Sequence, residues 1–211
     1  EIDLLKQIKT PYTIQYYGNI QFHGSPMILM EYCDRGSLRD MIDYRDLCLS
    51  EKQACIIIHD LLAGLLILQM KHKVMHRDIK AANILINSKG QVKVTGFGVG
   101  SKLSDKKTGT LSTKGTPYWM APEVINGQLQ TYSADIWSVG ATAIELIEGA
   151  PPYCEFDPTK AMLKIATVGF PGFRAPKLLT SNFKDFISKC MSRDPNNRWT
   201  AAQLMKHPWV A

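Results

Sequence analysis

The sequence predicts an α+β fold, in which a small region of strands is followed by a mostly helical domain. Residues 13–22 and 26–32 are rich in β-branched, aromatic and other apolar side chains and flank a Gly-containing turn, a pattern typical of two antiparallel strands. Residues 54–68 and 133–148 are long and largely apolar, which is typical of helices buried at the centre of a domain. The length of 211 residues suits one large domain.

The ends of these helices carry local signals. Residues 50–53 (SEKQ) form a capping box ahead of the first apolar run, with a hydroxyl at the N-cap and a glutamine three positions later. The GAPP stretch at 149–152 ends the second long helix. From Asp157 onward the pattern predicts two or three shorter helices, and a second capping box at 200–203 opens the last of them.

The remaining segments are shorter. Apolar residues recur at helical spacing within 1–9, which favours the end of an amphipathic helix, and a short helix is expected over 37–42. Residues 83–86 and 91–94 predict a small hairpin around a Ser-Lys-Gly turn. Residues 96–123 show no clear periodicity, and an irregular segment of that length in a compact domain is usually functional or disordered.

Composition and charge narrow the class of protein. Hydrophobic residues make up 45% of the chain and charged residues 21%, which indicates a globular protein. The net charge is +6, but the lysines are spread along the chain without interleaved aromatics, so we expect a solvated surface and no nucleic-acid partner. The five cysteines are scattered without a C-x-x-C motif, which argues against a disulfide framework or zinc site and favours a reducing cytoplasm.

The apolar run 54–68 is the candidate for a membrane span. It is shorter than the roughly 20 residues that a spanning helix needs, and it carries His59 and Asp60 in its middle. We therefore expect a core helix here and no membrane contact in this segment. The chain begins at Glu1 rather than at methionine, so we also expect it to be a fragment of a longer protein.

Residues 76–83 (HRDIKAAN) carry the most informative motif of the chain. A site that phosphorylates a hydroxyl needs a carboxylate to accept the proton of that hydroxyl, an amide to hold magnesium and a lysine to meet the γ-phosphate. Asp78, Asn83 and Lys80 supply these three groups within one short loop. The motif lies between a predicted buried helix and a predicted hairpin, where it resembles the catalytic loop of the protein kinases.

Further stretches resemble kinase motifs in the same order along the chain. GTPYWMAPE at 115–123 resembles the end of the activation segment, and DIWSVG at 135–140 resembles the helix whose buried aspartate holds the catalytic loop through backbone N–H groups. MEYC at 30–33, followed by GSL at 36–38, resembles the hinge that pairs with the adenine edge. Together with KHPW at 206–209, these motifs are most similar to those of the sterile-twenty group of serine/threonine kinases, especially its germinal-centre and MST-like members.

The resemblance covers essentially the whole chain and implies how it is divided. Residues 1–32 correspond to part of the N-terminal lobe (the end of helix C and two strands) and 33–36 to the hinge. Residues 37–211 correspond to the C-terminal lobe, with the activation segment at 96–123. The implied cofactors are ATP and magnesium, and the implied partners are protein substrates or a partner kinase or scaffold.

The resemblance also assigns roles to single residues. Asp78 would be the catalytic base, Lys80 would steady the γ-phosphate and Asn83 would hold the metal. Arg77 would bind a phosphorylated activation segment and Thr116 would contact the catalytic loop. The residues expected at the nucleotide are Glu31, Cys33, Leu85, Asn83 and Glu1; the expected phosphate acceptors are Ser112 and Thr113; the expected buried ion pair is Glu123 with Arg198; and the expected packed spine is Leu5, Tyr16, His76 and Phe97.

The chain departs from the family pattern in two places. At 96–98 it has Gly-Phe-Gly where kinases carry Asp-Phe-Gly, so the main carboxylate ligand of magnesium is missing. The Gly-rich loop and the ATP-binding lysine would fall before Glu1. If these losses removed about 4 kcal/mol of transition-state stabilisation, the rate would fall on the order of a thousandfold. Aspartate and glycine codons differ by one base, so a sequence variant is another explanation of Gly96.

Two functions remain open at this point. The first is a serine/threonine kinase that is catalytically impaired as written. The second is a pseudokinase, a binding or scaffold module that keeps the fold and docks a partner kinase without catalysis. Retention of Asp78, Lys80 and Asn83 favours the enzyme, whereas Gly96 favours the module.

Overall fold

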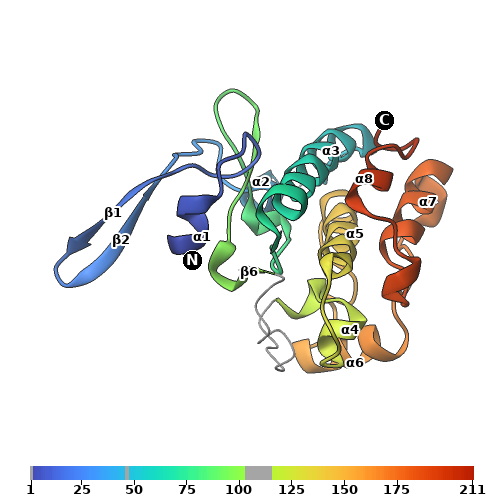
Figure 1. The fold of residues 1–211 in the computed structure, drawn as a ribbon. Coiled ribbons are helices and arrows are strands. Elements are labelled where there is room, and N and C mark those ends of the chain that lie inside the picture. Colours follow the sequence, from blue (N-terminus) through green and yellow to red (C-terminus); the bar gives the residue numbers. More distant parts are fainter. Residues whose placement is uncertain (1, 46–47, 103–115) are drawn as a thin grey trace.

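The structure is a computed structural model and describes residues 2–45, 48–102 and 116–211. Figure 1 shows a two-stranded hairpin at one end of the molecule and a helical body at the other, and the predicted α+β class is confirmed. Helices α3 and α5 run through the middle of this body and contact each other. Their buried side chains belong to one continuous hydrophobic core.

The N-terminal region consists of helix α1 (Ile2–Gln7) and an antiparallel hairpin of β1 (Tyr16–Phe22) and β2 (Ser25–Met30). The hairpin is shorter than predicted at both outer ends, and a register shift interrupts it between Tyr16 and Gly18. It projects from the helical body in Figure 1. Large apolar side chains are exposed on it, at Tyr17, Ile20, Phe22, Met27 and Leu29.

Helix α2 (Leu38–Arg45) is followed by the long helix α3 (Glu51–Ile67). The predicted capping box at the start of α3 is confirmed. A π-helical turn, η1 (Leu68–His72), extends the helix to 22 residues, so the expectation that it is too short for a membrane span is wrong on length. Half of its most apolar window is buried inside the domain, and its buried side chains belong to the hydrophobic core.

Helix α5 (Tyr132–Glu148) starts from an N-cap at Thr131, and most of its residues are buried, as predicted. Gly140 lets it approach the end of α7, because a Cβ there would lie 2.5 Å from Met191 Cγ. The other α-helices of the body are α4 (Pro122–Ile125), α6 (Pro158–Thr167), α7 (Ser181–Cys190) and α8 (Ala201–Leu204), and α8 has the predicted capping box.

Two small antiparallel sheets frame the segment 76–83. Strand β3 (Val74–Met75) precedes this segment and pairs with β6 (Ser101–Lys102), while β4 (Ile84–Ile86) follows it and pairs with β5 (Val92–Val94). A bridge between Thr13 and Val94 connects the second sheet to the N-terminal region. The 3-10 turns are η2 (Ala81–Asn83), η3 (Phe97–Val99), η5 (Pro117–Trp119), η6 (Pro176–Leu178) and η7 (Pro195–Asn197).

Candidate active site

Asp135, a buried residue of α5, holds the segment 76–83 in place. Its carboxylate accepts hydrogen bonds from the backbone N–H groups of His76 and Arg77, at 2.9 and 2.8 Å. Arg77 has a φ of 72°, in the left-handed region that costs free energy for a non-glycine residue. The two bonds therefore stabilise a strained turn, and the predicted contact between the buried aspartate and the loop is confirmed.

Asp78 lies at the centre of a polar cluster. Lys80 Nζ is 2.9 Å from Asp78 Oδ2, and the Thr116 hydroxyl donates to Oδ1 at 2.8 Å. Asn83 Nδ2 donates to Asp78 Oδ2 at 2.8 Å and to the Asp78 backbone carbonyl at 2.7 Å. Lys80 Nζ also donates to Thr116 Oγ1 at 2.5 Å. The structure thus brings together four of the site residues that the sequence predicted.

The environment of Asp78 favours its charged form. Burial acts to raise the pKa of this carboxyl, but hydrogen bonds from Lys80 and Thr116 outweigh it, so the pKa lies below its usual value. The carboxylate is ionised at neutral pH and can only accept hydrogen bonds. Lys80 and Asn83 donate to Oδ2, whereas Oδ1 accepts only from Thr116 and can accept a further hydroxyl.

Glu145, which the sequence reasoning did not single out, also holds the catalytic loop at 76–83 in place. This buried carboxylate of α5 accepts the backbone N–H of Ala81 at 3.0 Å and the indole Nε1–H of Trp119 at 2.9 Å. Arg39 Nη1 approaches its other oxygen at 3.4 Å. Burial raises the pKa of Glu145, against these hydrogen bonds. Glu145 lies in the last turn of a helix that also carries Asp135 and Glu148, and its position within an otherwise apolar run was the one available signal.

The ring of His76 packs against the start of the activation segment. Its centroid is 4.8 Å from that of Phe97, and both side chains are fully buried. His76 Nε2 lies 2.8 Å from the carbonyl oxygen of Thr95. Burial lowers the pKa of His76, and the charge of Asp135 opposes this effect. Of the other two residues expected in the spine, Leu5 is buried and Tyr16 is half-buried.

Gly96 lies directly against Asn83. A Cβ built on Gly96 would lie 2.5 Å from Asn83 Nδ2 and 2.6 Å from Asn83 Cγ, closer than real side-chain contacts. The Asn83 amide therefore fills the space where a side chain at position 96 would begin. Gly96 itself has a φ of 85° and caps the turn η3.

The residues present do not fit the magnesium site that the family pattern implies. Position 96 has no side-chain oxygen to offer, and the Asn83 amide group turns its Nδ2 toward Asp78. Magnesium favours carboxylate and phosphate oxygens. No group of three His, Cys, Asp or Glu side chains within residues 2–45, 48–102 and 116–211 is placed to hold a metal ion.

Two of the residues expected around the adenine, Cys33 and Leu85, lie at strand β4, which follows the catalytic loop. The loop at 33–37 pairs with β4, through a bridge between Ser37 and Leu85 and a hydrogen bond from Arg35 N to the Ile86 carbonyl. Cys33 is buried, and burial raises the pKa of its thiol. Leu85 is half-buried, so both predicted residues flank the same short strand pairing.

Glu31 is occupied by contacts within the chain. Its carboxylate lies 3.3 Å from the ammonium of Lys93, a buried residue of β5, and accepts the backbone N–H of Gln15 at 3.3 Å. Asn87 Nδ2 approaches its other oxygen at 3.5 Å. Sequence reasoning missed Lys93, which sits between two valines in a strand and neutralises the charge beside the loop at 33–37.

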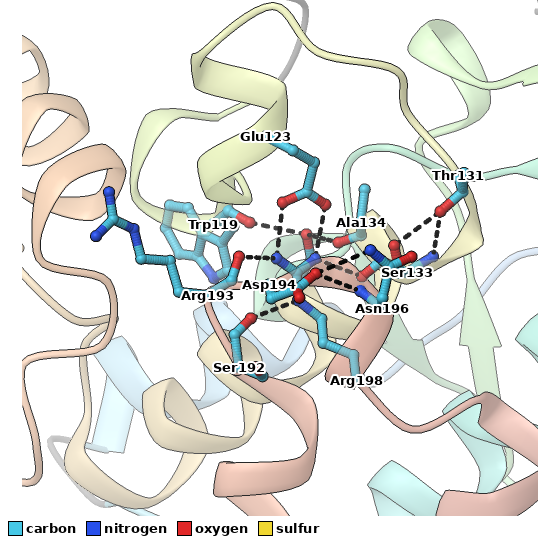
Figure 2. Close-up of polar contacts among 11 residues, drawn as sticks. Trp119, Glu123, Thr131, Ser133, Ala134, Ser192, Arg193, Asp194, Asn196 and Arg198 are labelled. Atoms are coloured by element: carbon cyan, nitrogen blue, oxygen red, sulfur yellow. Dashed lines mark hydrogen bonds and ion pairs between the residues drawn. The ribbon is translucent and has the colours of Figure 1, made fainter.

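Glu123 and Arg198 form the predicted buried ion pair, which is drawn in Figure 2. Both guanidinium Nη atoms donate to the carboxylate, at 2.6 and 2.7 Å. The guanidinium also donates to the backbone carbonyls of Ser133 and Ser192 and lies 5.2 Å from the ring centroid of Trp137. The pair fastens the end of the activation segment to the loop before α8.

Some predicted residues lie outside the described part of the chain. These are Glu1 and the expected phosphate acceptors Ser112 and Thr113, together with residues 103–115 of the predicted activation segment. The backbone of Arg77 is fixed by Asp135. Because the expected phosphate acceptors lie outside the described residues, a phosphate-binding role for the Arg77 side chain stays a prediction.

The sequence model of the protein kinase domain family matches residues 1–210. The match spans nearly the whole chain, and the chain therefore belongs to the protein kinase family. Members of this family transfer phosphoryl groups from ATP with magnesium and act on protein substrates. The matched residues include the loop around Asp78, the Asp135 anchor and the ion pair between Glu123 and Arg198.

Proposed function

We propose that the protein is a serine/threonine kinase in which Asp78 accepts the proton of a substrate hydroxyl. The observation that carries this proposal is the position of Asp78 between the Lys80 ammonium at 2.9 Å and the Thr116 hydroxyl at 2.8 Å. A substrate hydroxyl that donates to Oδ1 beside Thr116 Oγ1 meets an ionised acceptor. Lys80 keeps the base oriented and compensates its negative charge.

The substrate class follows from the same two neighbours. Thr116 marks a place beside Asp78 where a small aliphatic hydroxyl donates a hydrogen bond. Lys80 reaches both the carboxylate and this hydroxyl, so its positive charge lies where a transferred phosphoryl group would need compensation. A seryl or threonyl hydroxyl resembles the Thr116 group more closely than a phenol does, which supports serine/threonine specificity.

We also propose that phosphoryl transfer is impaired in the chain as written. Position 96 supplies no metal ligand, and Asn83 points its amide N–H atoms at the base. Loss of about 4 kcal/mol of transition-state stabilisation corresponds to a rate on the order of a thousandfold lower. A carboxylate at position 96 would require the Asn83 side chain to rotate, which a flexible amide can do.

The second candidate function is a non-catalytic binding module, and one observation favours it. The Asn83 amide closes over Gly96 and bonds twice to Asp78, so the polar cluster is complete without a metal or a nucleotide. A site of this kind supports the fold of the helical body. The module would then act through its surface on a partner kinase or scaffold.

The experiment compares three forms of the longest protein that the gene encodes: the natural form, Gly96→Asp and Gly96→Ala. Transfer of phosphate from ATP to a generic basic protein is measured with and without magnesium. The kinase proposal expects Gly96→Asp to gain orders of magnitude in rate and Gly96→Ala to gain nothing. The added variant Asp78→Asn in the Gly96→Asp form should lower the rate by about 10²–10⁴.

The outcomes separate the two functions. If Gly96→Asp stays as inactive as Gly96→Ala while both forms remain folded, the kinase proposal fails and the binding module remains. If the natural form already transfers phosphate at a rate that Asp78→Asn abolishes, the proposed impairment is wrong. A gain that is seen with threonine and serine peptides but not with tyrosine peptides supports the substrate class.

A further inference from the structure

A largely buried ion pair joins the N-terminal region to the small sheet that follows the catalytic loop. The Lys93 ammonium lies 3.3 Å from Glu31 Oε2, and the two side chains are only 8% and 16% exposed. Lys93 belongs to β5, whereas Glu31 directly follows β2 of the projecting hairpin. Neither side chain contacts the donors around Asp78, so the polar cluster at the base does not account for this pair.

The backbone and the side chain of Glu31 are fixed together. The Glu31 N–H donates to the Gln15 carbonyl at 2.8 Å, and the Gln15 N–H donates to Glu31 Oε2 at 3.3 Å. Asn87 Nδ2 approaches Glu31 Oε1 at 3.5 Å. Asn87 lies in the turn between β4 and β5, so it contacts the carboxylate from the same sheet as Lys93. Because Gln15 bonds to both parts of Glu31, a displaced carboxylate would also displace the backbone.

The backbone of this segment has one free acceptor and one free donor. The Glu31 N–H and the Cys33 carbonyl are used, by Gln15 and by the N–H of Gly36. The Glu31 carbonyl and the Cys33 N–H have no hydrogen-bond partner within residues 2–45, 48–102 and 116–211. An acceptor and a donor two residues apart suit a base edge on which an amino N–H lies beside a ring nitrogen. Adenine has such an edge, at its N6 and N1 atoms.

We propose that Lys93 is a positioning residue for adenine recognition. It holds Glu31 so that the Glu31 carbonyl and the Cys33 N–H keep the spacing that the base requires. This inference rests on the kinase function proposed above, and it concerns the base alone. Without the Lys93 ammonium, the Glu31 carboxylate would stay largely buried with no counter-charge, which is unfavourable. The carboxylate would then turn toward water and pull the backbone out of position.

The test measures the binding of adenosine, which carries the base without phosphate, to the longest protein that the gene encodes. Calorimetry gives the affinity, and a ¹⁵N spectrum follows the Cys33 amide. The matched control probe is N6,N6-dimethyladenosine, a neutral analogue that has no amino N–H to donate to the Glu31 carbonyl. We expect adenosine to shift the Cys33 amide saturably and the dimethyl analogue to bind more weakly.

Lys93→Met removes the ammonium and should weaken adenosine binding about fivefold to tenfold, as the loss of one hydrogen bond does. Lys93→Arg keeps the charge and should recover most of this loss. Glu31→Gln should weaken binding as well, and Glu31→Gln combined with Lys93→Met should be no weaker than either alone, because both act through one contact. The control is Lys89→Met, at an exposed position of the same hairpin, which should leave binding unchanged.

The inference is wrong if adenosine does not bind the natural protein, or if Lys93→Met binds it as tightly. It is also wrong if Lys93→Arg is as weak as Lys93→Met. Amide signals of α7 should stay unchanged in each variant, which separates lost positioning from general loosening. Should Lys93→Met fail to fold, Glu31→Gln decides in its place. No phosphoryl transfer is involved, so adenosine binding can depend on Lys93 in a protein that fails every transfer assay.

Discussion

Arg198 and Glu123 form a bidentate ion pair that is excluded from water, with Nη–Oε distances of 2.6 and 2.7 Å. The two residues belong to segments far apart in the sequence, the helix α4 and the loop before α8. The guanidinium also donates hydrogen bonds to the backbone carbonyl groups of Ser133 and Ser192. One side chain therefore joins α4, α5 and the C-terminal region, and its loss affects all three.

Glu123→Ala should destabilise the folded state strongly. The substitution leaves the Arg198 charge buried without its carboxylate, which costs about 3–5 kcal/mol in comparable pairs. The free energy of unfolding is measured by urea denaturation. The control is Asp43→Ala, which removes the partner of Arg39 from a pair whose Asp43 side chain is 65% exposed and should cost about 0.2–1 kcal/mol. Equal effects of the two substitutions would contradict the role given to the buried pair.

Asp135→Ala should loosen the catalytic loop. It leaves the backbone N–H groups of His76 and Arg77 without an acceptor, at a cost of about 2–4 kcal/mol in unfolding free energy. Asp135→Asn keeps one oxygen and should cost less. Hydrogen exchange of the Arg77 amide should accelerate more than that of amides in α7. If this amide remains as protected in the alanine variant, another group holds the strained turn.

His76 should make stability depend on pH below its ordinary pKa. Burial lowers the pKa of His76 in the folded state, while the unfolded chain has a pKa of about 6.5. Between the folded pKa and about 6.5 the unfolded state binds more protons, so stability falls as the pH falls.

The measurement compares the natural chain with His76→Gln by urea denaturation from pH 7.5 to 5.5. The stability advantage of the natural chain should shrink as the pH falls below about 6.5 and should stay constant above it. The contribution of Glu145, whose pKa burial raises, is present in both proteins and largely cancels, whereas the pKa of Asp135 depends on His76 and forms part of the measured difference. An advantage that grows on acidification would reverse the assigned direction of the pKa shift.

The elements that the sequence predicted well are those set by neighbouring residues. The capping boxes at Ser50 and Thr200 are local patterns, and both helices begin where these patterns place them. The apolar runs identified α3 and α5 because burial on most sides requires such runs. The π-helical turn after Ile67 and the pairing of β3 with β6 had no periodic signal, since each involves only a few residues.

The candidate site was predictable where its residues share one motif. Asp78, Lys80 and Asn83 occur within six residues of one another, and the fold brings them together with Thr116. Glu145 was not predictable as a support, because its donors come from three separate segments, at Arg39, Ala81 and Trp119. Only the packing of α5 against these segments shows what its carboxylate does.

The last prediction tests the contact between Gly96 and Asn83 by stability alone. Gly96 and Gly90 have similar positive φ values, 85° and 74°, so alanine is strained at both, by about 1–2 kcal/mol. A Cβ at Gly90 meets nothing within 4 Å, whereas one at Gly96 lies 2.5 Å from Asn83 Nδ2. Gly96→Ala should therefore cost about 1 kcal/mol more than Gly90→Ala, because the Asn83 side chain must move and its bonds to Asp78 weaken.

A double-mutant cycle assigns this excess to Asn83. Asn83→Ala removes the amide that a Cβ at position 96 would meet, so Gly96→Ala should cost no more than Gly90→Ala in that background. All variants are compared by urea denaturation at one pH. If Gly96→Ala and Gly90→Ala are equally costly when Asn83 is present, the amide does not fill the space at position 96. The closed arrangement around Asp78, on which the binding-module function depends, would then be wrong.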